Sequence, residues 1–131
     1  FINDAGGSLC ELEDPKLFKL LSANTLIIYI KTSKENERAL IERAKETPKP
    51  MYYNPVFFQR SIQNYLAENN LEYAAEISPD SFVSWVFPKL IEDRLKKYST
   101  IANKYGCTIQ SDDLHSCSSA NDVIDLISRA L

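Results

Sequence analysis

A polar turn near the amino terminus holds the first residues that could take part in chemistry. Residues 3–8 read Asn-Asp-Ala-Gly-Gly-Ser. Asp4 could hold a magnesium ion through water, or accept a hydrogen bond from a substrate hydroxyl. Gly6 and Gly7 would let backbone N–H groups approach a ligand closely, and Ser8 could donate a hydrogen bond. Because Gly-Gly turns that follow strands are often purely structural, the turn keeps a structural and a ligand-binding interpretation.

A second group of candidates consists of cations around a proline-rich connection. Arg43 and Lys45 precede residues 47–55, a stretch with three prolines, and Lys49 lies within it. The prolines exclude both a helix and a central strand, so we expect a stiff, exposed connection. Cations on such a connection suit a lid that closes over phosphates. They equally suit a solvated helix end, where the helix dipole favours positive charge.

A third candidate is the segment Ser111-Asp112-Asp113, which follows the last expected strand. We expect a loop here, at the carboxyl edge of the sheet, where ligands bind in parallel α/β proteins. Such a loop could line an adenine pocket. Serine and aspartate are also common in turns and helix caps, so this second interpretation stays open.

The overall composition excludes several classes of function. The chain has 131 residues, enough for one domain with a core. Its 15 basic and 18 acidic residues give a net charge of −3, which argues against nucleic acid as a partner. No apolar run approaches the length of a membrane span, and the first residues lack the pattern of a signal peptide.

The cysteines and the single histidine exclude further kinds of site. Cys10, Cys107 and Cys117 are widely spaced and odd in number, which fits neither a disulfide framework nor a zinc site. His115 is the only histidine, too little for a histidine-based metal site or a Ser-His-Asp triad. We therefore expect free thiols and a cytoplasmic protein.

The elements that must position these candidates follow an α/β pattern in which helix dominates. A strand is expected to end at Asp4, a buried strand to span residues 25–30, and a short strand to span residues 107–110. The apolar run over residues 25–30 does not alternate, which is typical of a parallel strand buried on both faces. Expected helices cover residues 14–21, 34–45, 56–69, 79–105 and 119–131.

Two features of the expected helix over residues 79–105 are informative. Pro88 should bend or restart it. The apolar stripe within it is predicted to belong to the core rather than to a ligand site, and it comprises Phe82, Trp85, Val86 and Phe87.

Taken in order along the chain, three stretches resemble the shikimate-kinase-like P-loop ATPases and small-molecule kinases. Residues 1–9 (FINDAGGSL) are similar to the strand and glycine segment that contacts substrate in that family. Residues 25–43, followed by 49–51, are similar to its fourth strand, helix and basic lid. Residues 107–131 are similar to its last strand, adenine-side loop and closing helix. The combination of NDAGGS, KPMYY and SFVSWVFPKL also resembles a set of bacterial ATPases.

The chain departs from this family pattern in three places. The family typically has three glycines where Ala5-Gly6-Gly7 stands, and an Arg-Pro pair where Lys49-Pro50 stands. The defining G-x-x-x-x-G-K-[ST] loop, which holds the β- and γ-phosphates, does not occur in the sequence. The chain starts at Phe1 without an initiator methionine. We therefore expect residues 1–131 to form a single partial α/β domain.

The resemblance implies a definite fold. It is the carboxyl-terminal part of a P-loop NTPase-like parallel sheet, helix-rich and with its first strands missing. In that family the first strand lies between the strand that ends at Asp4 and the strand over residues 25–30. Its loss would expose apolar sheet edges.

The resemblance also implies a small-molecule or nucleotide ligand, with ATP and Mg²⁺ as cofactors of the parent protein. Catalysis would depend on positioning and charge stabilisation. The implied residues are a substrate or metal turn, two catalytic cations, a further substrate-binding cation and an adenine-bordering pair: Asp4, Gly6, Gly7 and Ser8; Arg43 and Lys49; Arg60; Ser111 and Asp112.

Two other functions remain open at this point. The chain could be a non-catalytic, helix-rich interaction module that associates with itself through exposed sheet edges. It could also be a degenerate kinase that keeps the fold without the chemistry. Under the kinase hypothesis, we expect the isolated chain to be inactive in ATP hydrolysis and to bind nucleotide weakly at most.

Overall fold

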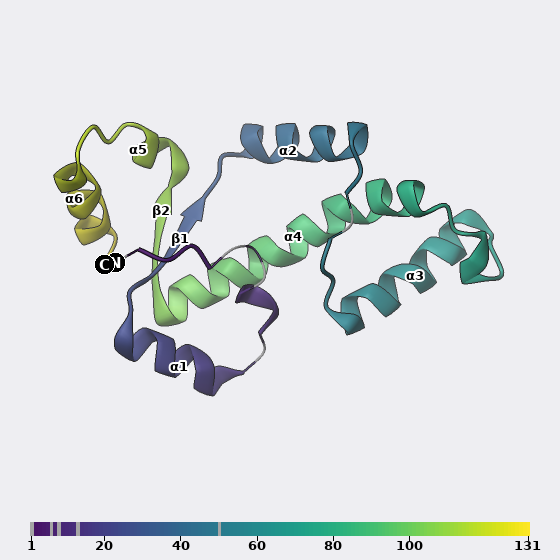
Figure 1. The fold of residues 1–131 in the computed structure, drawn as a ribbon, viewed down its shortest axis with the longest axis horizontal. Coiled ribbons are helices and arrows are strands. Elements are labelled where there is room, and N and C mark those ends of the chain that lie inside the picture. The colour runs from purple at the N-terminus through teal and green to yellow at the C-terminus, as the bar shows by residue number, and fades with distance from the viewer. Residues whose placement is uncertain (1, 6, 8, 13, 50) are drawn as a thin grey trace. The chain divides into compact units, whose positions relative to one another are not determined.

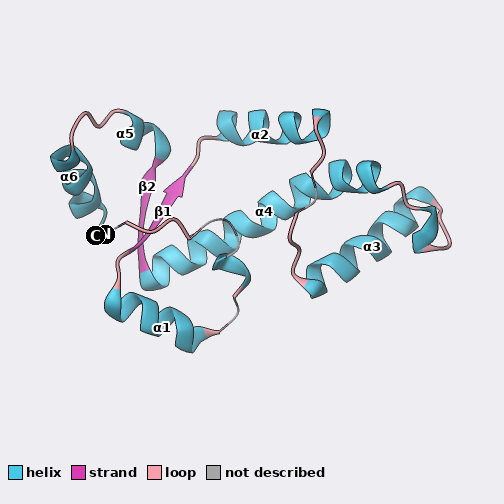
Figure 2. Cartoon of the chain, viewed as in Figure 1, coloured by secondary structure: helices cyan, strands magenta, loops and turns pink. Residues whose placement is uncertain are grey.

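The computed structural model describes residues 2–5, 7, 9–12, 14–49 and 51–131 (Figure 1). Within them the chain is a helix-rich mixed α/β protein with a small parallel sheet (Figure 2). In chain order the elements are the 3₁₀ helix η1 (Leu9–Glu11), α1 (Pro15–Asn24), β1 (Ile27–Lys31), α2 (Lys34–Glu46), α3 (Pro55–Asn69), the 3₁₀ helix η2 (Ala74–Glu76), α4 (Pro79–Tyr105), β2 (Gly106–Gln110), α5 (Ser111–His115) and α6 (Ala120–Ala130).

Side-chain caps fix where the helices begin. The Ser33 hydroxyl accepts a hydrogen bond from the Asn36 amide at 3.2 Å, just before α2. Asn54 caps α3 by accepting from two amides of its first turn. Ser119 caps α6, and the Asp122 carboxylate accepts in return from the Ser119 amide. The helices expected over residues 34–45, 56–69 and 119–131 are therefore confirmed to within a residue or two, because their signals are local.

The sheet consists of β1 and β2, paired in parallel from Ile27 opposite Gly106 to Lys31 opposite Gln110. Gly106 ends α4 and begins β2, and a side chain there would overlap the carbonyl oxygen of Ile27. The position therefore requires glycine for close approach of the two backbones. β1 begins two residues later than expected, since Thr25 still caps α1 with its amide.

Two expectations about secondary structure are wrong. Residues Ile2–Ala5 are not in a strand, because a strand needs a neighbour to pair with and the sheet of the described residues consists of β1 and β2 alone. Residues Ser111–Asp113 belong to the short helix α5 rather than to a loop. At Pro88 the structure excludes one of the two expected outcomes: α4 continues through this residue without restarting, and a bend there stays a prediction.

The chain divides into two compact units. One unit comprises residues 1–38 and 94–131, and the other comprises residues 39–93. The division falls within α2 and within α4, so each of these helices contributes residues to both units.

The core of the 39–93 unit is apolar and rich in aromatic rings. Partly buried side chains, including Trp85, surround it. Edge-to-face ring pairs link Tyr65 to Phe82 at 5.4 Å and to Trp85 at 5.2 Å between centroids. The predicted core role of the aromatic stripe is confirmed. The buried cluster consists of Phe57, Tyr65, Phe82, Val86 and Leu90.

The other unit has a smaller apolar core around its sheet. Phe18 of α1 stacks on Tyr105 of α4 with ring centroids 5.5 Å apart. Its buried apolar residues are Cys10, Phe18, Ala102, Cys107 and Ile109.

β1 is less buried than its apolar sequence predicts. Ile30 is 50% exposed, and Leu26, just before the strand, is 47% exposed. The prediction of burial on both faces is therefore wrong for this chain. Among the described residues β1 has a strand neighbour on one edge alone, which leaves part of its surface open to solvent.

Candidate functional site

The carboxyl ends of the two strands meet at one edge of the sheet. Lys31 and Gln110 are the last paired residues, and from there β1 runs into α2 and β2 into α5 (Figure 1). This edge is where ligands bind in parallel α/β sheets. The parallel pairing thus brings the segments after both strands to one place.

Ser111 and Asp112, the predicted adenine-bordering pair, lie at this edge. Ser111 is buried, and its hydroxyl donates to the Asp112 carboxylate at 3.3 Å. The Ser111 carbonyl lies 2.6 Å from a ring nitrogen of His115, so the pair also stabilises α5. Asp112 is exposed. Both interpretations of this pair, a helix-start device and a ligand edge, are compatible with this geometry.

The start of α2 contributes negative charge to the same edge. Glu35 and Glu37 lie in its first turn. Lys34 pairs with Glu37 at 3.4 Å. Although helix N-termini attract anions, carboxylates in the first turn oppose a phosphate there. The start of α2 is therefore a poor phosphate site without further cations.

Gly7 lies against α4. Its carbonyl oxygen accepts a hydrogen bond from the Tyr98 hydroxyl at 2.6 Å and from the Cys10 thiol at 3.4 Å. A Cβ atom at Gly7 would lie 3.1 Å from the Tyr98 hydroxyl oxygen, so the close approach favours glycine. Asp4 is exposed. The predicted site residues Gly6 and Ser8 lie outside the described residues.

Just after this turn, a buried carboxylate is held by two cations of α4. The Glu11 side chain is 2% exposed. It accepts hydrogen bonds from Arg94 Nε at 2.9 Å and from Lys97 Nζ at 2.8 Å. We call Glu11, Arg94 and Lys97 the buried ion cluster. Both carboxylate oxygens have a charged donor, the condition under which a buried charge is tolerated.

Burial raises the pKa of two groups beside this cluster, the Tyr98 hydroxyl and the Cys10 thiol. Loss of solvent raises the pKa of the Tyr98 hydroxyl well above its usual range, and its hydrogen bond with Cys10 raises it further. Burial also raises the pKa of the Cys10 thiol. At neutral pH both groups stay protonated. Tyr98 is therefore a donor to Gly7, and Cys10 is a poor nucleophile.

The buried ion cluster was missed by sequence reasoning, although α4 carries a signal for it. Phe82, Val86, Leu90 and Arg94 recur at every fourth residue and are all buried. A charged residue that continues a buried apolar stripe needs a buried partner of opposite charge. The partner, Glu11, is 83 residues away in sequence, so no local pattern identifies it.

The predicted phosphate-handling cations belong to the 39–93 unit. Arg43 and Lys49 are exposed. Arg60 lies over the Phe57 ring, 5.8 Å from its centroid, an arrangement typical of a cation–π contact. Lys45 pairs with Glu42 at 2.7 Å. Asp4, Gly7, Ser111 and Asp112 belong to the other unit, so the candidates form two separately described groups.

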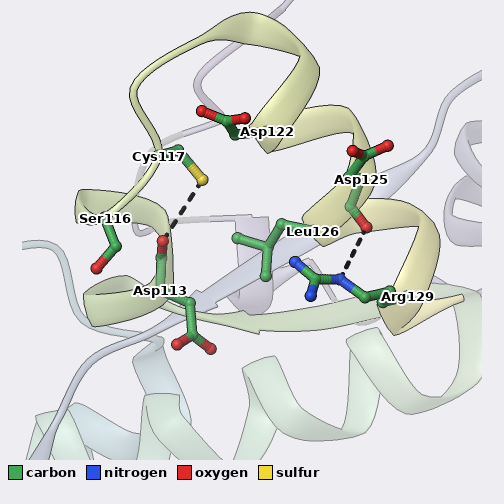
Figure 3. A pocket seen from close by; sticks show the side chains of 7 residues that line it. All are labelled: Asp113, Ser116, Cys117, Asp122, Asp125, Leu126 and Arg129. Carbon is green, nitrogen blue, oxygen red and sulfur yellow. Dashed lines mark hydrogen bonds between the residues drawn. The ribbon is translucent and has the colours of Figure 1, made fainter.

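An open hollow lies between α5 and α6 (Figure 3). Figure 3 shows Leu126 near its middle, with carboxylates around it. The Arg129 Nε donates to the Asp125 backbone carbonyl at 3.2 Å. Because carboxylates dominate, the hollow disfavours an anionic ligand. Its lining is Asp113, Ser116, Cys117, Asp122, Asp125, Leu126 and Arg129.

The described part of the chain contains neither a metal-binding cluster nor a helix that could span a membrane. No three His, Cys, Asp or Glu side chains gather there as a metal site requires. None of the described helices combines the length and the apolar character that a membrane span needs.

No family model, curated protein or solved structure matches this chain.

Proposed function

We propose that this chain is the carboxyl-terminal part of an ATP-binding P-loop ATPase or small-molecule kinase. The observation that carries the proposal is the parallel pairing of β1 with β2. It brings the segment after each strand to one edge of the sheet. The position of Ile2–Ala5 outside the sheet is in keeping with the resemblance, since in that family another strand separates this segment from β1.

In this proposal the residues work by positioning and charge rather than by covalent chemistry. Ser111 and Asp112 border the adenine ring. Asp4 binds Mg²⁺ through water or contacts substrate, and Gly7 contacts substrate together with Gly6 and Ser8. The exposed cations Arg43 and Lys49 neutralise the transferring phosphate, and Arg60 binds substrate.

The β- and γ-phosphates need a further binding element. The 131 residues contain no G-x-x-x-x-G-K-[ST] loop, so the proposal requires that loop from other residues. These 131 residues alone should therefore not hydrolyse ATP. The three free cysteines suit a protein of the reducing cytoplasm.

The test uses the purified 131-residue chain with ATP and Mg²⁺. We expect no ATP hydrolysis and at most weak binding, with a Kd on the order of 1 mM or higher. Ser111→Ala combined with Asp112→Asn should abolish that binding, whereas Asp125→Asn, a carboxylate of α6 outside the proposed site, should leave it unchanged. Robust hydrolysis by this chain would contradict the proposal, as would binding that is insensitive to the double substitution.

A self-associating module is the second candidate function, and the exposure of Leu26 and Ile30 favours it. Apolar side chains beside an unpaired strand edge promote pairing with a second copy. Sedimentation of the purified chain tests this candidate. A concentration-dependent dimer that is lost in Ile30→Lys would support it, and a monomer at high concentration would contradict it.

A further inference from the structure

The buried ion cluster joins two segments that are distant in sequence. Glu11 belongs to η1, directly after the Gly7 turn, and its partners Arg94 and Lys97 lie one turn apart on α4. The Glu11 side chain is almost fully inaccessible, so its charge is stabilised by these two cations rather than by water.

Such an arrangement contributes more to position than to net stability. Removing a carboxylate and two cations from water offsets most of the attraction between them, so a well-packed apolar cluster would stabilise the fold at least as well. The ion pairs instead favour one orientation of η1 against α4. The carboxylate has both oxygens occupied in one orientation of η1 against α4, and a shifted η1 would leave the buried Glu11 carboxylate without these two donors.

Two further contacts extend this fixed geometry from η1 to the turn. Tyr98, next to Lys97 on α4, donates to the Gly7 carbonyl oxygen at 2.6 Å. Cys10, next to Glu11, donates to the same oxygen at 3.4 Å. α4 thus contacts the Gly7 backbone through Tyr98 and the Glu11 side chain through Arg94 and Lys97.

We propose that Glu11 is the positioning residue of Gly7, acting through Arg94 and Lys97 to hold η1, and with it the Gly7 carbonyl, against α4 before any ligand binds. What the turn contacts depends on the proposed function, but the holding itself does not. A turn that is fixed in advance loses less conformational freedom when a ligand binds.

Thiol labelling of the full chain tests the proposal, because the three cysteines report on different places. Cys10 and Cys107 are both buried, Cys107 on β2, whereas Cys117 is partly exposed. In Glu11→Gln we expect the labelling rate of Cys10 to rise about tenfold or more. The substitution removes the buried negative charge that holds η1, and with it Cys10, to Arg94 and Lys97. The rate at Cys107 should stay unchanged. Glu68→Gln, which removes the negative charge of the carboxylate that accepts from the Trp85 ring N–H, is the matched control and should leave Cys10 protected.

Two outcomes would overturn the proposal. A parallel rise at Cys10 and Cys107 would mean that Glu11 stabilises the whole unit rather than the turn. Equal Cys10 rates in Glu11→Asp and Glu11→Gln would mean that the carboxylate charge does not hold η1. We expect Glu11→Asp, which keeps the charge, to label more slowly than Glu11→Gln.

A separate titration with ATP and Mg²⁺ keeps the two proposals distinguishable. If wild type hydrolyses ATP robustly, the proposed function fails, while the Cys10 rates still decide the role of Glu11. If wild type binds and Glu11→Gln binds more weakly with unchanged Cys10 labelling, the positioning proposal fails and the proposed function stands.

Discussion

The two ends of α4 are packed in contrasting ways. Its first part, in the 39–93 unit, presents Phe82, Val86 and Leu90 to a cluster of aromatic and aliphatic side chains. Its last part, in the other unit, presents Arg94 and Lys97 to the buried Glu11 carboxylate. One helix is therefore anchored by apolar contact at one end and by charge at the other.

The contrast indicates which part of the fold tolerates change. Apolar packing has no strict direction, so the cluster around Leu90 can absorb conservative substitutions. The buried ion cluster cannot, because loss of either cation weakens the compensation of the buried Glu11 carboxylate. The segment next to the Gly7 turn therefore depends on fewer residues than the aromatic core does.

Glu11→Ala should have the largest effect. The substitution removes the negative charge that Arg94 and Lys97 contact. We expect it to lower the free energy of unfolding of this segment by about 3–5 kcal/mol. Faster hydrogen exchange at the Leu12 amide, which donates to the Leu9 carbonyl in η1, would report it, while the Cys107 and Ile109 amides of β2 should be unchanged. The contrast between the two ends of α4 would be contradicted if Glu11→Ala lowered the free energy of unfolding by less than about 1 kcal/mol, the range of an exposed ion pair.

Leu90→Ala should have the next largest effect, a loss of about 2–5 kcal/mol in the free energy of unfolding, because Leu90 is 1% exposed and its truncation leaves a cavity. Trp85 is the only tryptophan and packs against this cluster, so its fluorescence reports the transition. Leu20→Ala is the control, since Leu20 is 63% exposed and should change little. Equal effects of the two leucine substitutions would contradict the assigned core.

Tyr98→Phe should have a smaller effect of about 1 kcal/mol, the contribution of one hydrogen bond. The raised pKa of Tyr98 means that its contribution is complete below the ordinary value of 10.0 and is lost as the pH rises toward the folded-state pKa. Stability should therefore fall above about pH 10 in wild type, and less steeply in Tyr98→Phe. Parallel alkaline profiles for the two proteins would show that Tyr98 does not contribute.

Asp122→Asn should have the smallest effect. The backbone hydrogen bond from Ser118 and the bonds from Ser119 lower the pKa of Asp122 below its ordinary value of 3.8. The carboxylate thus stabilises the start of α6 above that pH, and the contribution is lost as the pH falls through the lowered pKa. Acid titration followed by circular dichroism should show a shallower loss in Asp122→Asn. The same loss of helicity at acid pH in wild type and in Asp122→Asn would contradict this role of Asp122.

The sequence predicted best what depends on neighbouring residues. Ser33, Asn54 and Ser119 cap helices through contacts within three residues, so the helix starts could be found without the fold. The expected strand ending at Asp4 failed because strand pairing is a property of two segments. Glu11 was missed for the same reason, since its partners are 83 and 86 residues away.

In the candidate site, too, the local features could be predicted from the sequence and the long-range contacts could not. The turn at Gly7 and the pair Ser111-Asp112 could be identified from residue type and their places after expected strands. What holds Gly7, the Tyr98 hydroxyl, depends on a contact 91 residues apart in sequence. Residue type suggests which groups could do chemistry, whereas long-range packing decides which of them are held in place.

The most direct test of the proposed nucleotide edge is an amide NMR titration of the full chain with ATP and Mg²⁺. The proposal predicts that the largest shifts occur at Lys31, Ser111 and Asp112, at the carboxyl ends of the strands. Largest shifts at Ile27 and Gly106, the opposite ends, would contradict it.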